Sequence, residues 1–335
     1  MRKDKILLGH GSGGRLMHNL IKDLLLKKLD NLVLKELSDS AVINYKERLC
    51  FTTDSYVVNP LKFPGGDIGK LSVCGSINDL VMLGAKPEFL SLALIIEEGF
   101  EYRALENIID SISLTARKNG VNFVTGDIKV VEKGACDKIF INTSGIGRII
   151  KNKKLSVKNI APQDKIIITG NIAQHGFAVL TKRKELDLGF NIKSDCAALT
   201  GLIIPVLKKT NAIKFMRDPT RGGIATTLNE IAEAARLGII IEEKAIPISQ
   251  KVRAASELLG IDPLYVANEG SALLVVSSKV AKKVVALLRR HPLGRNAKII
   301  GEVVREPKGQ VILNTVLGTQ RIVDMLTNEP LPRIC

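Results

Sequence analysis

Residues 327–335 form a C-terminal tail that could carry a reactive group, because they end in a cysteine. Pro330 and Pro332 exclude a helix here and favour an extended backbone. At roughly 3.3 Å per residue, such a tail reaches on the order of 30 Å. Cys335 is not a prenylation site, since that signal places cysteine fourth from the end. The tail is therefore either a frayed end or an arm that delivers the Cys335 sulfur to a cleft.

Isolated aspartates could bind a metal ion, because carboxylate oxygens are suitable ligands for Mg²⁺. Asp79 is the most unusual of them, since no other charged residue lies between Lys70 and Lys86. Burying a carboxylate on so apolar a helix is costly unless a cation or a hydrogen-bond donor pairs with it. We therefore favour a metal ligand over a solvent-facing aspartate. The predicted metal ligands, each near the end of an expected strand or helix, are Asp54, Asp79, Asp127 and Asp218.

A glycine-rich segment at residues 9–14 could wrap around phosphate groups, because closely spaced glycines expose backbone N–H groups. Its spacing satisfies G-x-G-x-x-G, the dinucleotide-binding fingerprint. The context is poor for a Rossmann fold, since only three apolar residues precede it as a possible strand. We expect a flexible loop followed by an amphipathic helix over 15–28, with His10 and Ser12 adding side-chain donors. The alternative is a simple N-terminal loop without a ligand.

Two further glycine-containing turns lead into predicted helices. Residues 63–70 look at first like a P-loop, but they fail that test because Leu71 stands where Ser or Thr must bind Mg²⁺. We interpret them as a turn into a helix over 68–83. Residues 218–223 begin with helix-capping residues and end in two glycines, which let another backbone or a phosphate approach closely.

The composition is ordinary for a globular protein. The 335 residues are long enough for two domains, and they are 45% hydrophobic and 25% charged. No apolar run approaches the ~18 residues of a membrane helix. The apolar stretch near the N-terminus is also too short for a signal peptide. We therefore expect a cytoplasmic protein without a membrane partner. The five cysteines are scattered and show no C-x-x-C spacing, so neither a disulfide framework nor a zinc site is expected.

The formal net charge of +15 raises the question of nucleic-acid binding. Most Lys and Arg residues are dispersed among acids, and the nine Phe and four Tyr offer few rings for base stacking. The densest basic runs, at 151–154 and 182–184, are typical of solvated loops or helix ends. We expect no nucleic-acid partner, and the positive charge favours an anionic nucleotide or an acidic protein instead.

The expected strands and helices fall into two halves. The Lys-rich segment 151–160, which is followed by Ala161-Pro162, has the composition of a linker. Glu269 lies in a turn of the second half, just before a predicted strand. The elements expected before the linker are strands at 48–53, 89–96, 121–125 and 138–149 and helices at 68–83 and 101–118. The second half is expected to begin with a strand at 165–169 and helices around 174–184 and 195–208.

Several of these motifs together closely resemble the HypE family of hydrogenase-maturation proteins, a branch of the PurM-like, AIR synthase-related superfamily of ATP-binding proteins. The resemblance spans nearly the whole chain. Its most discriminating part is the terminal Pro332-Arg333-Ile334-Cys335, which relatives that merely use ATP would not need. The other matching segments are 9–14, 52–60, 63–70, 78–80, 126–127 and 218–223.

The resemblance implies a fold of class α/β plus α+β, with PurM-like two-domain ATP-binding architecture and an extended, mobile C-terminal tail. It also implies a homodimer. The implied divisions are a glycine-rich loop and helix at 1–40, an N-terminal α/β domain at 41–150, a linker at 151–164, a C-terminal α+β domain at 165–318, and a final strand and tail at 319–335.

The chemistry that the resemblance implies is an ATP-dependent dehydration. A HypF-type transferase places a carbamoyl group on Cys335, and this chain converts the group to a thiocyanate with ATP and Mg²⁺. The cyanide then passes to iron in a HypC–HypD complex, for [NiFe]-hydrogenase. Glu269 and Lys129 match positions of the family's tail-binding pair and are the implied catalytic partners of Cys335. The expected ATP- and phosphate-binding residues are His10, Gly11, Ser12, Gly13, Gly14, Lys70, Gly126, Arg221, Gly222 and Gly223.

Three other functions remain open at this point. Another PurM-like ATP-dependent kinase or synthetase would keep its activity without Cys335. A nicotinamide oxidoreductase would rest on the glycine spacing alone and would bind its cofactor without Mg²⁺. A non-catalytic scaffold that presents the thiol to partner proteins would show no nucleotide turnover.

Overall fold

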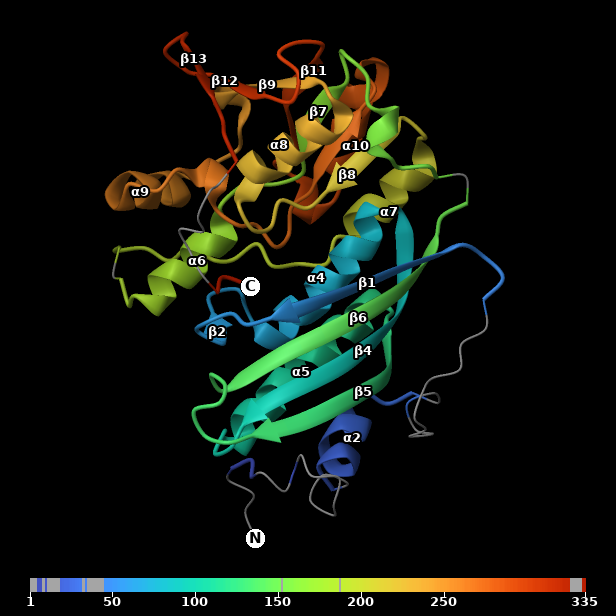
Figure 1. Cartoon of the computed structure of the whole chain (residues 1–335), viewed down its shortest axis with the longest axis vertical. Helices are drawn as coiled ribbons and strands as arrows, with labels where there is room; N and C mark the ends of the chain where they lie inside the picture. The colour runs from blue at the N-terminus through green and yellow to red at the C-terminus, as the bar shows by residue number, and fades with distance from the viewer. Residues whose placement is uncertain are drawn as a thin grey trace.

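The computed structural model describes residues 5–7, 10, 19–31, 34, 45–151, 153–186, 188–325 and 333–335. It contains a four-stranded sheet in the N-terminal part and a seven-stranded sheet in the C-terminal part (Figure 1). The C-terminus lies between the two parts. The predicted glycines Gly11, Gly13 and Gly14, with Ser12, fall outside the described residues.

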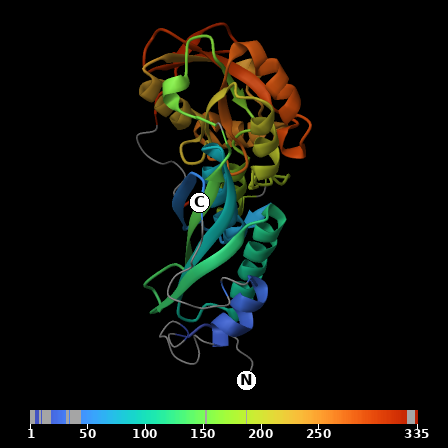
Figure 2. The ribbon, with the colours of Figure 1, turned by 90° about the vertical axis from the view of Figure 1, so that its right-hand side faces the viewer.

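The N-terminal sheet has the strand order β1-β6-β4-β5. Its strands are β1 (Leu49–Tyr56), β4 (Ala85–Glu97), β5 (Asn122–Val131) and β6 (Ile139–Ile149). Alternate residues of β6 are buried, as expected when one face of a sheet is covered and the other is open. Figure 2 shows the helices on one side of this sheet. Residues on the covered face and residues on the open face cannot contact each other within one chain.

Helix α4 (Ile68–Met82) is buried on nearly all sides. Asp67 caps it by accepting a hydrogen bond from the Lys70 backbone nitrogen at 2.8 Å. A helix that is apolar all round belongs in a core, and α4 contacts both the N-terminal sheet and elements of the C-terminal part. The amphipathic helix α5 (Tyr102–Asn119) packs beside it. Near the N-terminus lie η2 (Ile21–Leu25) and α2 (Leu26–Lys28), and the short strands β2 (Lys62–Phe63) and β3 (Gly66–Asp67) precede α4.

The C-terminal sheet has the order β13-β12-β9-β11-β7-β10-β8 and is antiparallel except where β12 runs parallel to β9. Helices α8 (Gly223–Ala235) and α10 (Ala281–Leu288) contact this sheet. Its strands are β7 (Lys165–Ile168), β8 (Ile213–Arg217), β9 (Gly238–Glu242), β10 (Leu273–Val276), β11 (Lys298–Val304), β12 (Val311–Asn314) and β13 (Gln320–Ile322). The helices are α6 (Gln174–Arg183), α7 (Thr200–Lys209), α8 (Gly223–Ala235), α9 (Gln250–Leu259) and α10 (Ala281–Leu288). Short 3-10 turns are η3 (Val157–Asn159), η4 (Glu243–Ala245), η5 (Pro263–Tyr265), η6 (Ser278–Val280) and η7 (Pro292–Gly294).

The predicted α/β plus α+β class and two-part architecture are confirmed. Several expected boundaries were wrong. The strand expected at 121–125 continues to Val131, and the helix expected around 195–208 begins only at Thr200. The first strand was expected to end at residue 53, but β1 continues to Tyr56. Asp54 therefore lies inside the strand, and alternation fixes the face to which its side chain points. In the described part of the chain, no helix has both the length and the apolar character that crossing a membrane requires.

Candidate active site at the junction of the two parts

A cavity of about 560 Å³ lies where β1 and α4 meet the C-terminal part. It collects side chains from distant segments of the chain. Six of the residues predicted from sequence line it: Asp54, Asp79, Asp218, Arg221, Glu269 and Cys335.

Asp79 and Asp54 enter the cavity from the N-terminal part. The Thr52 hydroxyl of β1 donates a 2.7 Å hydrogen bond to Asp79 Oδ2 on α4. Asp54 is two residues further along β1, so its side chain lies on the same, helix-covered face. Burial is the main cause that raises the pKa of Asp79; the Thr52 bond partly opposes it, and Asp54 adds to the rise. A buried Asp79 was expected to need a cation or a hydrogen-bond donor, and Thr52 supplies a donor.

Asp218 enters from the C-terminal part, between the end of β8 and the start of α8. Burial, followed by the nearby carboxylate of Asp79, raises its pKa to about 7. Thr220 and Arg221 line the cavity beside it. This carboxyl group is therefore harder to ionise than an ordinary aspartate.

Glu269 lies in the turn before β10, with only 3% of its surface exposed. Neither a hydrogen bond nor an ion pair to its carboxylate occurs within the described segments. Burial, followed by the charges of Asp218 and Asp195, raises the pKa of Glu269 well above its usual value. A buried carboxyl without a partner, facing a cavity, is typical of a group that transfers protons.

The turn that carries Glu269 is held by a second acid, Asp195. Its carboxylate accepts hydrogen bonds from the backbone nitrogens of Glu269 at 3.2 Å and Gly270 at 3.0 Å. A Cβ at Gly270 would lie 1.8 Å from the Asp195 carbonyl oxygen, so no larger residue fits there. These contacts fix the position of the Glu269 backbone.

Cys335 lines the same cavity because the end of the chain is docked there. Its carbonyl oxygen accepts a 3.3 Å hydrogen bond from the backbone nitrogen of Val57, which directly follows β1. Ile334 is only 2% exposed, and its carbonyl oxygen lies 2.8 Å from Nε2 of the buried His175. Burial lowers the pKa of His175 to about 4, so the ring is neutral at physiological pH. In this structure residues 333–335 therefore pack against the folded part of the chain, with Ile334 buried.

Asp127 and Lys129 do not reach this cavity, contrary to the predicted metal and tail-binding sets. They lie on β5, at the opposite edge of the sheet from β1 and about 14 Å away by strand spacing. They also lie on the other face: Lys129 is in register with the exposed Ile95, whereas Asp54 is in register with the buried Thr143. Lys129 Nζ instead pairs with Asp127 Oδ2 at 2.7 Å.

Several predicted phosphate-binding residues are also absent from the cavity lining: His10, Lys70, Gly126, Gly222 and Gly223. Close packing explains why glycine occupies three of these positions. A Cβ at Gly126 would lie 2.4 Å from the Leu92 carbonyl oxygen, one at Gly222 2.1 Å from Thr226 Oγ1, and one at Gly223 2.4 Å from the Leu264 carbonyl oxygen.

The two side chains in that set have local partners. Lys70 Nζ donates to the Gly65 carbonyl oxygen at 2.9 Å. His10 is buried, and its Nδ1 accepts a 3.0 Å hydrogen bond from the Leu7 backbone nitrogen. Its Nε2 has no hydrogen-bond partner among the described residues, so one polar atom there is left for a ligand or a neighbouring segment.

The acids of the cavity fit a cation only in part. Within the described residues, no three His, Cys, Asp or Glu side chains are arranged to hold a metal ion. Yet Asp54 and Asp79 both contribute to the raised pKa of Asp218, a mutual repulsion that a cation would relieve. Mg²⁺ at nucleotide sites commonly takes one or two carboxylates and completes its shell with phosphates and water. The donor set fits that kind of site.

Sequence reasoning missed Asp195 and His175. Asp195 was detectable by the criterion applied to Asp79, since it is the sole charged residue between Lys193 and Lys208. His175 gave no such signal, because its role depends on a contact with a residue 159 positions away.

Comparison with known proteins decides the family. Residues 37–149 match the AIR synthase related protein, N-terminal domain, and residues 161–314 match the corresponding C-terminal domain. Carbamoyl dehydratase HypE of Cupriavidus necator is 44% identical over 337 residues, covering 100% of this chain and 96% of that protein. The chain belongs to the HypE family. HypE of Escherichia coli K12 is 43% identical over 338 residues, covering 99% of this chain and 100% of that protein.

Solved HypE structures agree with this assignment. The crystal structure of a HypE in complex with ATP has a TM-score of 0.95 and 44% identity, covering 98% of this chain and 99% of that one. A HypE chain in a HypE–HypF complex has a TM-score of 0.81 and 46% identity, covering 92% and 99%.

Proposed function

We propose that this protein uses ATP to dehydrate an S-carbamoyl group on its own Cys335 to a thiocyanate. The observation that carries this proposal is the position of Cys335, because this residue lines the same cavity as Glu269 and the three aspartates. Relatives over the full length of the chain are named carbamoyl dehydratases. A kinase acting on a free small molecule would have no need of a docked thiol there.

The carbamoyl oxygen is a poor leaving group, and phosphorylation by ATP makes it a good one. The carbamoyl oxygen of Cys335-S–C(=O)–NH₂ attacks the γ-phosphorus of ATP, so ADP leaves and the oxygen becomes a phosphate ester. The nitrogen then loses its protons, the C–O bond breaks, and Cys335-S–C≡N and inorganic phosphate remain. Catalysis of phosphoryl transfer is mainly a matter of positioning and electrostatics.

Glu269 is the proposed proton acceptor for the nitrogen. Its burial and its acidic neighbours give it a raised pKa, which makes its ionised form a strong base. Asp54, Asp79 and Asp218 would hold Mg²⁺ together with the phosphate oxygens, and the ion would neutralise charge on the transferring phosphoryl group. Arg221 lines the cavity near the start of α8 and is the proposed phosphate-binding cation.

We further propose a homodimer in which the open face of the N-terminal sheet is covered by a second copy. That face exposes apolar side chains, with Phe51 at 67% and Ile95 at 43%. It also carries Asp127 and Lys129, which cannot reach the cavity of their own chain. A second copy on this face offers these two residues a site across the interface.

The proposed partners follow from the reaction. The carbamoyl group must come from a HypF-type transferase, and a relative at 46% identity has been crystallised with HypF. The cyanide must leave to an acceptor, for which we propose a HypC–HypD complex that carries the iron of [NiFe]-hydrogenase.

The test is the intact mass of the C-terminal peptide after incubation with the transferase and its substrates, before and after Mg-ATP. We expect a carbamoyl group on Cys335 and then the loss of one water that requires ATP. Cys335→Ala removes both changes, whereas Cys136→Ala, at another partly exposed cysteine, removes neither. Carbamoylation without the ATP-dependent loss of water would contradict the proposal.

A further inference from the structure

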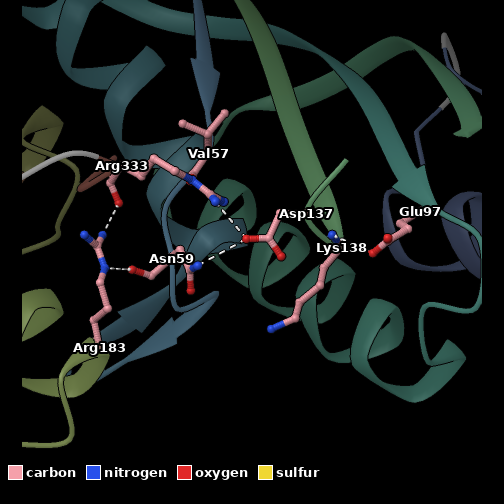
Figure 3. Close-up of polar contacts among 7 residues, drawn as sticks. All are labelled: Val57, Asn59, Glu97, Asp137, Lys138, Arg183 and Arg333. Atoms are coloured by element: carbon pink, nitrogen blue, oxygen red, sulfur yellow. Dashed lines mark hydrogen bonds and ion pairs between the residues drawn. The ribbon is translucent and has the colours of Figure 1, made fainter. Parts of the chain in front are cut away.

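Arg333, two residues before the terminal cysteine, is held at a site of its own (Figure 3). Its Nη1 donates to Asp137 Oδ2 at 2.7 Å, and its Nε donates to the Val57 carbonyl oxygen at 2.9 Å. The guanidinium also lies 5.8 Å from the centre of the Phe140 ring. These contacts use the planar, forked shape of the side chain as well as its charge.

Asp137 is fixed by contacts that do not involve the tail. Asn59 Nδ2 donates to the same Asp137 oxygen at 3.1 Å. The loop that carries Asp137 is tied to Glu97, whose carboxylate accepts hydrogen bonds from the backbone nitrogens of Gly134 at 2.6 Å and Lys138 at 3.1 Å. Figure 3 shows the contact of Glu97 with Lys138 and those of Asp137 with Asn59 and Arg333. The site for the guanidinium is therefore built by the folded N-terminal part.

The backbone of the tail is held separately. The Asn59 backbone nitrogen donates to the Arg333 carbonyl oxygen at 3.2 Å, and the Val57 nitrogen donates to the Cys335 carbonyl oxygen at 3.3 Å, so residues 333–335 run antiparallel to residues 57–59. Arg183 of α6 donates from Nη2 to the Arg333 carbonyl oxygen at 2.5 Å and from Nε to the Asn59 carbonyl oxygen at 2.6 Å. Backbone bonds of this kind accept almost any sequence, whereas the Asp137 contact distinguishes side chains.

We propose that Asp137 is a specificity-determining residue that recognises Arg333 and thereby places Cys335 in the cavity. This inference rests on the proposed dehydration of Cys335, because that reaction is what the placement serves. The hydrogen bonds from the Val57 and Asn59 backbone nitrogens and from the Arg183 side chain to the tail backbone hold any docked tail. The Asp137–Arg333 pair selects a tail with arginine two residues before the cysteine and sets how often the thiol is docked.

The experiment measures docking and reaction separately in the full-length protein. Docking is followed as the rate at which iodoacetamide alkylates Cys335, determined by mass spectrometry of the C-terminal peptide. Reaction is followed as ATP-dependent conversion of carbamoyl-Cys335 to thiocyanate, with the KM for ATP measured alongside. The variants are Asp137→Asn, Arg333→Lys, Arg333→Asp, Asp137→Arg and the double variant Arg333→Asp/Asp137→Arg.

The matched control is Asp262→Asn. Asp262 pairs with Arg321 at 2.6 Å with similar exposure, but it is not part of the tail site. We expect Asp137→Asn and Arg333→Lys to speed alkylation about three- to tenfold and to slow dehydration by a similar factor, with the KM for ATP unchanged. The control should match the wild type. The double variant should recover part of what each reversal loses, which a merely structural role would not produce.

Unchanged alkylation and dehydration in both Asp137→Asn and Arg333→Lys would overturn the inference. So would equal losses in the single and double reversals. Because Arg333 lies at the end of the chain, its variants report on the site even if an Asp137 variant folds poorly. Faster alkylation in these variants, together with no dehydration in the wild type, would refute the proposed function and leave the recognition of Arg333 standing.

Discussion

The Asn268 side chain donates a 2.8 Å hydrogen bond from Nδ2 to the carbonyl oxygen of Pro219. Asn268 directly precedes Glu269, and Pro219 directly follows Asp218. One amide therefore joins the two segments that carry the acids of the C-terminal part. Its Oδ1 also accepts from the Ala173 backbone nitrogen at 2.7 Å, and the residue is fully buried. After burial, the nearby charge of Asp218 is the next largest cause of the raised pKa of Glu269.

Asn268→Ala should destabilise the protein by about 2–4 kcal/mol, because the buried Ala173 nitrogen loses its Asn268 Oδ1 acceptor and the carbonyl oxygens of Pro219 and Val266 each lose a donor. Urea unfolding followed by circular dichroism measures the change. Asn119→Ala is the control: it removes a single hydrogen bond to Thr115 at the end of α5 and should cost less than about 1 kcal/mol. Equal losses in the two variants would show that Asn268 does not join these segments as described.

Gly270→Ala should disrupt the site, because its Cβ would overlap the Asp195 carbonyl oxygen at 1.8 Å. We expect a loss of more than about 3 kcal/mol in urea unfolding. Gly260→Ala provides the matched control. Gly260 ends α9 with φ +65°, but a Cβ there meets nothing within 4 Å, so only the conformational cost of about 1 kcal/mol remains. A tolerated alanine at position 270 would contradict the close packing of this turn.

The stability of the protein should fall as pH rises from about 4 to about 7, in part because of Asp218. Its folded-state pKa of about 7 exceeds the ordinary value of 3.8, so the folded state binds more protons than the unfolded state in that interval. The free energy of unfolding therefore decreases with pH there and is independent of this group above it. Asp218→Asn should flatten the slope between pH 5 and pH 7. An unaltered slope would mean that Asp218 titrates normally.

Asp79→Asn should abolish turnover while leaving the fold intact. The amide oxygen can still accept the Thr52 hydrogen bond, but the variant lacks the negative charge needed to hold Mg²⁺. Thermal unfolding and thiocyanate formation are measured in parallel, with the exposed Asp110→Asn as control. Full activity in Asp79→Asn would remove this residue from the proposed metal site.

Glu269→Gln should stop dehydration and at the same time stabilise the folded state. The substitution keeps the shape of the side chain and removes a buried carboxyl whose ionised form is repelled by Asp218 and Asp195. Urea unfolding should show a larger increase in the free energy of unfolding at pH 8 than at acidic pH, because the wild-type carboxyl is more costly to bury where its ionised form is favoured. Retained thiocyanate formation would exclude Glu269 as the base.

The main helices and strands, the family and the candidate reactive residues could be predicted from the sequence. An uninterrupted apolar pattern predicted α4, and the single charge within it singled out Asp79. The terminal Pro332-Arg333-Ile334-Cys335 pointed to the family and to the reactive thiol. The helix and the family were confirmed, because a helical pattern and a terminal motif depend on residues that are close together in the chain. The roles of Asp79 and of the Cys335 thiol stay predictions.

The tertiary structure alone decided which of these residues meet. Asp54 and Asp127 are equally isolated aspartates in the sequence, yet strand order and side-chain alternation place them on opposite faces and edges of one sheet. Arg333 finds Asp137 across 196 positions, and His175 finds Ile334 across 159. No local pattern encodes such contacts, because they arise only when separate segments pack against each other in the folded chain.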